Sequence, residues 1–223
     1  MVSENHLVTP KTARYYVLGN ITPQTQCLWF ALHGYGQAAA DFVAENFSCL
    51  PAHRHVVVAP EALNRFYWNG FGGKPVANWM TSADRLNEIT DYITYLNALY
   101  QHITQNLPDG CQPAINLLGF SQGAATLSRW FAAGQVQADK VIFWAGSLAH
   151  DLQWENAAPL FNKTQTYLFY GNEDQFITPE NLNLQKQLLH LHKVNFTGVE
   201  FEGKHTIPAG VLVEHFGLDG TKP

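Results

Sequence analysis

The chain has 223 residues, of which 46% are hydrophobic and 13% aromatic, so it can bury a substantial apolar core. Charged residues make up only 14%, against roughly 25% in an average soluble domain. The formal net charge is −5, and no basic run occurs anywhere in the chain. These values argue against disorder, against a coiled coil, and against nucleic-acid binding, which requires a clustered positive surface.

The three cysteines, Cys27, Cys49 and Cys111, lie far apart and form no Cys-x-x-Cys pair. This pattern argues against a disulfide scaffold or a structural zinc site, and it is typical of a reducing compartment. Residues 1–9 lack the basic and apolar regions of a secretory signal, and the apolar runs are far shorter than the roughly 18 residues of a membrane span. We therefore expect a cytoplasmic protein without stable membrane insertion.

Short apolar runs alternate with longer helical patterns, and no repeat or linker interrupts them. This alternation predicts a single α/β domain over residues 1–223, with a mostly parallel central sheet and helices on both faces. The first half is expected to hold strands at 13–18, 27–32 and 56–59, then a helix at 81–106 capped by Thr81 or Ser82. A strand at 114–119 and a helix at 122–133 follow, and then strands at 140–144 and 166–170. The last elements are a helix at 179–192 that opens with Pro179, a strand at 194–201 and a helix around 211–217.

The strand at 114–119 runs directly into Gly119-Phe-Ser121-Gln-Gly123, and a helical pattern follows. Gly-x-Ser-x-Gly between a strand and a helix is the pattern of a nucleophile elbow, in which a strained turn exposes the serine hydroxyl. The helix N-terminus contributes free N–H groups and a partial positive charge, which favour an oxyanion. We therefore expect Ser121 to be a nucleophile; the alternative is a glycine-rich turn that contains an incidental serine.

The early strand at 27–32 is followed by His33-Gly-Tyr35-Gly-Gln37. Glycines in this loop would allow a backbone N–H to turn toward the serine, so we expect the N–H groups of Tyr35 and Gln122 to be the oxyanion donors. His33 precedes the serine, whereas the chain order in this fold is serine, acid, histidine. We therefore expect His33 to shape the loop rather than to act as the base.

The acid is expected in the turn that follows the strand at 166–170, because functional groups of open α/β sheets gather at the carboxyl edge. Two candidates stand in this turn, Glu173 and Asp174, and Asp174 is the preferred one. An aspartate that only bonds its own turn backbone is the alternative.

The base is expected to be His205, which lies in a loop between the strand at 194–201 and the last helix. It would take the proton of Ser121 and return it to the leaving group, while Asp174 fixes the imidazole tautomer. The other histidines that follow the acid lie in helical patterns, where packed or solvated side chains are usual: His190, His192 and His215.

Four segments together resemble the phospholipase/carboxylesterase family of α/β-hydrolases, which includes acyl-protein thioesterases: LHGYGQ at 32–37, GFSQG at 119–123, YGNEDQFITPE at 170–180 and GKHTIP at 203–208. The resemblance implies an α/β-hydrolase fold and a serine hydrolase. It also implies Ser121, Asp174 and His205 as the triad, with Tyr35 and Gln122 as oxyanion donors. Gln37 stands where the family often has aspartate, and the segment 65–79 differs as well, so the substrate class stays open.

The segment 65–79 is rich in aromatic residues and glycine, and without helical or strand periodicity it is expected to be a loop. Exposed apolar patches usually cover a pocket or meet a partner. One hypothesis is that Trp68, Phe71 and Trp79 line an acyl pocket, together with Phe176 and Leu148 from neighbouring loops. The alternative is an aromatic cluster that packs on the long helix. The low overall charge favours an apolar or uncharged acyl group.

The first functional hypothesis is a carboxylesterase that cleaves small-molecule esters of small or apolar acyl groups through an acyl-enzyme. It would use no metal and no cofactor, since no residue cluster has metal-ligand spacing. Thioester and lysophospholipid hydrolysis are close alternatives. The alternative of another class is a catalytically idle hydrolase fold that serves as a binding module. Oligomeric state is left open.

Overall fold

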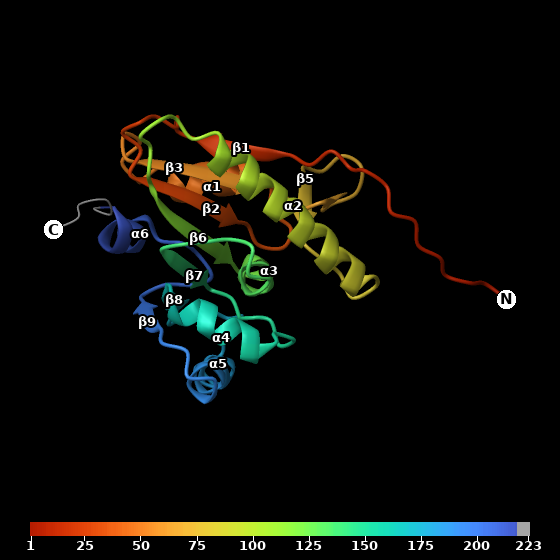
Figure 1. Cartoon of the computed structure of the whole chain (residues 1–223). Coiled ribbons are helices and arrows are strands. Elements are labelled where there is room, and N and C mark those ends of the chain that lie inside the picture. The colour runs from red at the N-terminus through yellow and green to blue at the C-terminus, as the bar shows by residue number, and fades with distance from the viewer. Residues whose placement is uncertain (218–223) are drawn as a thin grey trace.

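The computed structural model describes residues 1–217, and one seven-stranded sheet organises this part of the chain (Figure 1). Its strands are β1 (Tyr15–Leu18), β2 (Cys27–Leu32), β3 (His55–Pro60), β6 (Ala114–Phe120), β7 (Lys140–Trp144), β8 (Gln165–Gly171) and β9 (Thr197–Phe201). The spatial order is β1-β3-β2-β6-β7-β8-β9. Only the edge strand β1 runs antiparallel to its neighbour, so the predicted mostly parallel sheet is confirmed.

Six helices cover this sheet within residues 1–217: α1 (Ala39–Phe47), α2 (Arg85–Gln105), α3 (Gln122–Ala132), α4 (Trp154–Asn162), α5 (Pro179–Leu191) and α6 (Ala209–Phe216). Buried side chains of α1 and α6 belong to one hydrophobic cluster, and those of α2, α3, α4 and α5 belong to another. The two clusters lie on opposite faces of the sheet, which confirms helices on both faces. No helix among the described residues is long and apolar enough to span a membrane.

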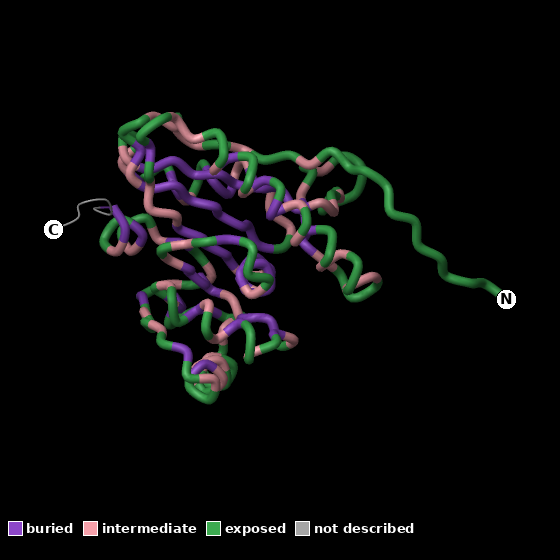
Figure 2. The backbone as a smooth tube through the Cα atoms, viewed as in Figure 1, coloured by how far each residue is buried: buried purple, intermediate pink, exposed green. Residues whose placement is uncertain are grey.

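The strands β2 and β3 are buried along their whole length (Figure 2). Successive side chains of a strand point to opposite faces, so neighbouring residues supply different clusters. Trp29 packs edge-on against Phe216 of α6 at 5.4 Å between ring centroids, whereas Phe30 meets Trp130 of α3 at 6.1 Å. Burial on both faces explains why these segments are continuous apolar runs in the sequence.

The prediction of a single loop over 65–79 is wrong. This segment contributes to an antiparallel hairpin of β4 (Asn64–Tyr67) and β5 (Pro75–Asn78). Each strand has four residues, and β5 begins with a proline, so no periodic signal was long enough to reveal it. The hairpin is fixed by tertiary pairing, because Ala77 bridges to Gln37 in the loop after β2.

The start of α2 also differs from its prediction. The helix begins at Arg85, and neither Thr81 nor Ser82 is its N-cap residue. Instead, the backbone N–H and the hydroxyl of Thr81 both donate to the carboxylate of Glu88 in the first turn. Glu88 also accepts a bond from Asn64 Nδ2 at 2.7 Å. The Glu88 carboxylate therefore attaches the first turn of α2 to β4 and to the segment that precedes the helix.

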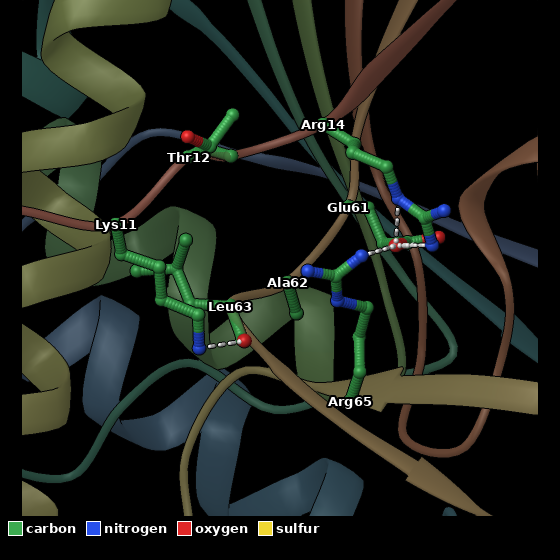
Figure 3. A pocket seen from close by; sticks show the side chains of 8 residues that line it. Lys11, Thr12, Arg14, Glu61, Ala62, Leu63 and Arg65 are labelled. Atoms are coloured by element: carbon green, nitrogen blue, oxygen red, sulfur yellow. Dashed lines mark hydrogen bonds and ion pairs between the residues drawn. The ribbon is translucent and has the colours of Figure 1, made fainter.

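A buried carboxylate joins β1 to the turn that follows β3 (Figure 3). Glu61 is 5% exposed and accepts bonds from Nε and Nη2 of Arg14, with Arg65 Nη1 4.0 Å away. Lys11 donates to the carbonyl oxygen of Leu63 next to it. These contacts hold the N-terminal segment along the connection between β3 and β4.

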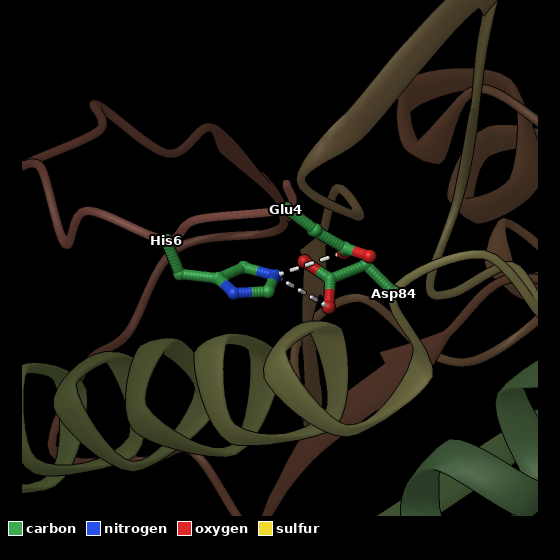
Figure 4. Close-up of side chains that lie close together, drawn as sticks. All are labelled: Glu4, His6 and Asp84. Atoms are coloured by element: carbon green, nitrogen blue, oxygen red, sulfur yellow. Dashed lines mark ion pairs between the residues drawn. The ribbon is translucent and has the colours of Figure 1, made fainter. Parts of the chain in front are cut away.

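Farther toward the N-terminus, one ring nitrogen of His6 meets two carboxylates (Figure 4). Its Nε2 is 3.3 Å from Glu4 Oε1 and 3.4 Å from Asp84 Oδ1, at the start of α2. All three side chains are well exposed, so solvent screens these contacts and they contribute little to stability.

Candidate active site

The predicted catalytic residues lie in loops at one edge of the sheet. The carboxyl ends of five neighbouring parallel strands, β2, β6, β7, β8 and β9, meet there (Figure 1). Loops at this edge of an open α/β sheet are the usual position of functional groups. Ser121 follows β6, Asp174 follows β8 and His205 follows β9, while the loop 33–37 follows β2.

Ser121 stands between β6 and α3 with a backbone conformation that non-glycine residues rarely adopt, φ 54° and ψ −118°. Its N–H donates to the carbonyl oxygen of Trp144 at 2.9 Å, which holds the turn against β7. Its side chain makes no capping hydrogen bond to α3. A strained position of this kind costs on the order of 1–3 kcal/mol and is typical of functional sites. The strained turn that the sequence predicts is therefore present.

Close backbone approaches bring the loop 33–37 against this turn. A Cβ atom at Gly123 would lie 2.4 Å from the carbonyl oxygen of Leu32, so only glycine permits α3 to approach β2 this closely. A Cβ atom at Gly34 would lie 3.1 Å from Cβ of Ser121. The loop that follows β2 is thus a direct neighbour of the serine.

Asp174 and His205 are hydrogen-bonded to each other. His205 Nδ1 is 2.8 Å from Asp174 Oδ2, and the Asp174 side chain is fully buried. The second carboxylate oxygen, Oδ1, accepts the backbone N–H of Phe176 at 2.8 Å. Glu173, the alternative acid, is exposed and meets the β9 loop through its backbone N–H, which donates to Gly203. The structure therefore brings Asp174, and not the Glu173 carboxylate, to His205.

The ring of His205 lies between two phenylalanine rings. Its centroid is 4.9 Å from that of Phe120 and 4.7 Å from that of Phe176. Phe120 directly precedes Ser121, so this packing holds the imidazole beside the serine turn. The other candidate histidines lie elsewhere: His190 packs on Phe196, His192 stacks on Trp154, and His215 bonds the backbone of α6.

The backbone of the loop 33–37 leaves one N–H group open. Gly34 N–H donates to Gln37 Oε1 at 2.7 Å, and Gly36 N–H donates to the carbonyl oxygen of Ala77 at 2.9 Å. Between them, the N–H of Tyr35 donates to no group in the described part of the chain. Gln122 is the first residue of α3, where backbone N–H groups have no acceptor within the helix. Both predicted oxyanion donors are thus available in the backbone.

His33 is completely buried beneath this loop. Its Nε2 accepts the N–H of Ala62 at 3.1 Å, so the ring proton sits on Nδ1, which donates to the carbonyl oxygen of Gly34 at 2.7 Å. Burial lowers the pKa of His33 to about 4, although the bond to Gly34 and the charge of Glu61 oppose this shift. A neutral imidazole that ties two loops together agrees with the predicted loop-shaping role.

The five predicted substrate contacts divide into two groups. Trp68, Phe71 and Phe176 are exposed, with fractions of 54%, 98% and 61%. Trp79 and Leu148 are 1% and 3% exposed and belong to the hydrophobic core below α2 and α3. The structure therefore gives no support to direct substrate contacts by Trp79 and Leu148, because neighbouring side chains cover them.

Two features of the site were missed in the sequence. Gly146, after β7, packs so closely on the serine turn that a Cβ atom would lie 2.4 Å from the carbonyl oxygen of Ser121. A glycine just after the strand next to the nucleophile strand was the available signal. The contacts of Gln37 with Ala77 and of Gln122 with Trp79 and Met80 had no such signal, because they depend on where the segment 77–80 packs.

The mostly parallel sheet, with the strained serine turn at its carboxyl edge, is the α/β-hydrolase fold. The family model described as Serine hydrolase (FSH1) matches residues 28–214, which include all the predicted site residues. The chain therefore belongs to this serine hydrolase family, and the family resemblance that the motifs predicted is confirmed. No curated protein matches the chain.

Solved structures share the fold at low sequence identity. A carboxylesterase from Mesorhizobium loti has a TM-score of 0.69 at 18% identity, covering 95% of this chain and 98% of its own. Acyl-protein thioesterase 2 from Zea mays has a TM-score of 0.68 at 18% identity, with coverages of 92% and 96%. A phospholipase/carboxylesterase from Dyadobacter fermentans has a TM-score of 0.66 at 20% identity, with coverages of 95% and 99%. At these identities the likeness establishes the α/β-hydrolase fold.

Proposed function

We propose that the protein is a carboxylesterase that cleaves esters of small or apolar acyl groups, with Ser121, His205 and Asp174 as its catalytic triad. One observation carries the proposal. A buried carboxylate and an imidazole are hydrogen-bonded at 2.8 Å in the loops beside a serine in a strained strand-to-helix turn. Membership of a serine hydrolase family supports the same chemistry.

The first half of the reaction forms an acyl-enzyme. With Nδ1 turned to Asp174, His205 has Nε2 left to accept the hydroxyl proton of Ser121 while Oγ attacks the ester carbonyl carbon. The carbonyl oxygen becomes an oxyanion, which accepts bonds from the N–H groups of Tyr35 and Gln122. The tetrahedral intermediate collapses, the C–O bond to the alcohol breaks, and the imidazolium returns its proton to the leaving alkoxide.

The second half repeats these steps with water. His205 takes a proton from a water molecule, whose oxygen attacks the acyl carbon, and the proton then returns to Ser121 Oγ as the acid leaves. Asp174 stabilises the imidazolium in both halves. Its burial suits this task, since each of its oxygens already has one donor, from His205 and from the backbone of Phe176.

Aromatic side chains on both sides of the site support an apolar acyl group. On one side, Trp68 packs against Tyr35 at 5.8 Å and Phe66 at 6.0 Å between ring centroids. Tyr35 is also the residue that carries the open N–H. On the other side, the exposed ring of Phe176 lies against His205. We include Trp68, Phe71 and Phe176 in the proposed acyl-binding surface.

The same groups would hydrolyse thioesters and lysophospholipids, because the attack on the carbonyl is the same. A panel of p-nitrophenyl esters, acyl thioesters and lysophospholipids with matched acyl lengths separates these substrates. Preference for the thioester or lysophospholipid series would replace the carboxylesterase assignment while preserving the triad. A preference for strongly charged acyl groups would contradict the proposed apolar surface.

The decisive experiment compares p-nitrophenyl acetate and butyrate hydrolysis by the wild type, Ser121→Ala and the control Ser48→Ala. Ser48 is exposed at the end of α1, away from the site. We expect activity in the wild type and the control, and none above background in Ser121→Ala. A fluorophosphonate probe should label Ser121, as mapped by peptide mass spectrometry. An inactive wild type would favour an idle hydrolase fold, and equal activity in Ser121→Ala would rule out Ser121 as the nucleophile.

We also propose a cytoplasmic location. It is supported by the three cysteines, which lie far apart in the sequence and form no Cys-x-x-Cys pair, as is typical of a reducing compartment. Fractionation of cells that produce the untagged protein tests this location, and recovery from an exported fraction would refute it.

A further inference from the structure

The hairpin strand β5 is bonded to the loop that carries one proposed oxyanion donor. Gly36 N–H donates to the carbonyl oxygen of Ala77 at 2.9 Å, and Ala77 N–H donates to the carbonyl oxygen of Gln37 at 3.0 Å. These two bonds form an isolated antiparallel bridge between Gln37 and Ala77, which attaches the loop 33–37 to the hairpin. Tyr35 directly precedes Gly36, so its N–H is held at the edge of β5.

The two residues that follow this strand are bonded to the residue that carries the other donor. The side-chain amide of Gln122 accepts the N–H of Trp79 through Oε1 at 3.0 Å, and its Nε2 donates to the carbonyl oxygen of Met80 at 2.9 Å. An amide that both accepts and donates to consecutive backbone groups fixes position and orientation at once. The first residue of α3 is therefore attached to the chain just beyond β5.

Trp79 also contacts the residue that follows β2. Its indole Nε1 donates to the carbonyl oxygen of His33 at 2.8 Å, and its ring lies 5.1 Å from the imidazole of His33. The side chain is 1% exposed, so this bond is shielded from water. The segment 77–80 therefore contacts the loop 33–37 at two places, through Ala77 and through the indole of Trp79. It contacts the first residue of α3 through the backbone of Trp79 and Met80.

We propose that Trp79 and the side-chain amide of Gln122 are positioning residues that set the spacing between the two oxyanion donors. This inference rests on the proposed function. Such donors stabilise a transition state only when they lie about 2.7–3.1 Å from the developing oxyanion. The N–H group of Tyr35 belongs to the loop after β2 and that of Gln122 to the start of α3, and the segment 77–80 is bonded to both elements, through Ala77 on one side and through Trp79 and Met80 on the other.

The test uses Gln122→Met, which keeps the backbone N–H and the side-chain length but removes both amide bonds, and Trp79→Phe, which removes the indole bond to His33. Each has a matched control outside the site. Gln135→Met alters an exposed glutamine beyond the end of α3, and Trp154→Phe alters a tryptophan of α4 that stacks on His192. The active fraction of every variant is titrated with a fluorophosphonate, and kcat is calculated per reactive serine.

We expect Gln122→Met and Trp79→Phe to lower kcat about 10-fold or more, less than the roughly 10²–10³ of a lost donor, with KM changed less than about 3-fold. The inhibition constant of an alkyl trifluoromethyl ketone, which forms a charged tetrahedral adduct with the serine, should rise in proportion to the loss in kcat/KM. The two control variants should retain both values. A purely structural role would lower the active fraction or the melting temperature and leave kcat per site and the inhibition constant unchanged.

The outcomes separate this inference from the proposed function. If the wild type shows no Ser121-dependent hydrolysis, the proposed function fails first. If the wild type is a Ser121-dependent esterase and either folded variant keeps its kcat per site and inhibition constant, the positioning role is wrong while the triad stands. One variant removes the bonds of the Gln122 amide and the other removes the indole bond of Trp79, so a folding defect in one variant leaves the other as the test.

Discussion

Acidification should weaken the fold through His33, which is buried and neutral beneath the Tyr35 loop. Its pKa is about 4 in the folded chain, against an ordinary value of 6.5. Between these two pH values the unfolded chain binds a proton on His33 that the native chain does not. The contribution of neutral His33 to the free energy of unfolding is therefore complete above pH 6.5 and is lost as the pH falls toward 4. A pKa difference of about 2.5 corresponds to about 3 kcal/mol, lost almost entirely between pH 7 and 4.

The measurement is the free energy of unfolding in urea at pH 7, 6, 5 and 4.5, for the wild type and His33→Asn. The variant lacks the titrating group, so we expect it to be less stable at pH 7 but to lose less stability on acidification. The difference between the two proteins should shrink by up to about 1.4 kcal/mol per pH unit below pH 6. The control is His53→Asn, which removes an exposed histidine and should reproduce the wild-type slope.

Parallel pH curves for the wild type and His33→Asn would refute this reasoning. They would mean that His33 is protonated as readily in the native chain as in the unfolded one. The bond from Ala62 would then be lost as the ring is protonated, because a doubly protonated ring has no acceptor for the Ala62 N–H, whereas Nδ1–H would still donate to Gly34.

Three further predictions concern the site and its support. Asp174→Asn should lower kcat by roughly 10³–10⁴ with little change in stability, whereas Glu173→Gln should keep kcat; equal effects would remove Asp174 from the triad. Asp151→Asn should cost about 2–3 kcal/mol in urea unfolding, because it removes the carboxylate partner of the buried Arg129 guanidinium; a smaller loss would show that other groups satisfy this charge. Trp68→Ala should reduce kcat/KM about 10-fold for p-nitrophenyl butyrate and less for acetate; a uniform ratio across acyl lengths would exclude an acyl contact.

The strands and the order of the loops could be read directly from the sequence. Parallel strands buried on both faces must be continuous apolar runs, so segments such as 27–32 and 140–144 were predicted with the boundaries that the structure has. Glycines on both sides of Ser121 mark a local requirement, since the turn allows no side chain there. Asp174 and His205 could be selected because the carboxyl ends of parallel strands always meet at one edge.

The tertiary structure decided what depends on partners far away in the chain. The strands β4 and β5 are too short to show a period; they pair with each other, and β5 is also bridged to the loop after β2. Trp79 belongs to the same aromatic segment as the exposed Trp68 and Phe71, but its side chain is buried and its indole N–H donates to the backbone carbonyl oxygen of His33. The amide of Gln122 likewise has no local partner in the elbow motif. The sequence by itself therefore determined which residues reach the sheet edge, and only long-range packing decided which groups hold them there.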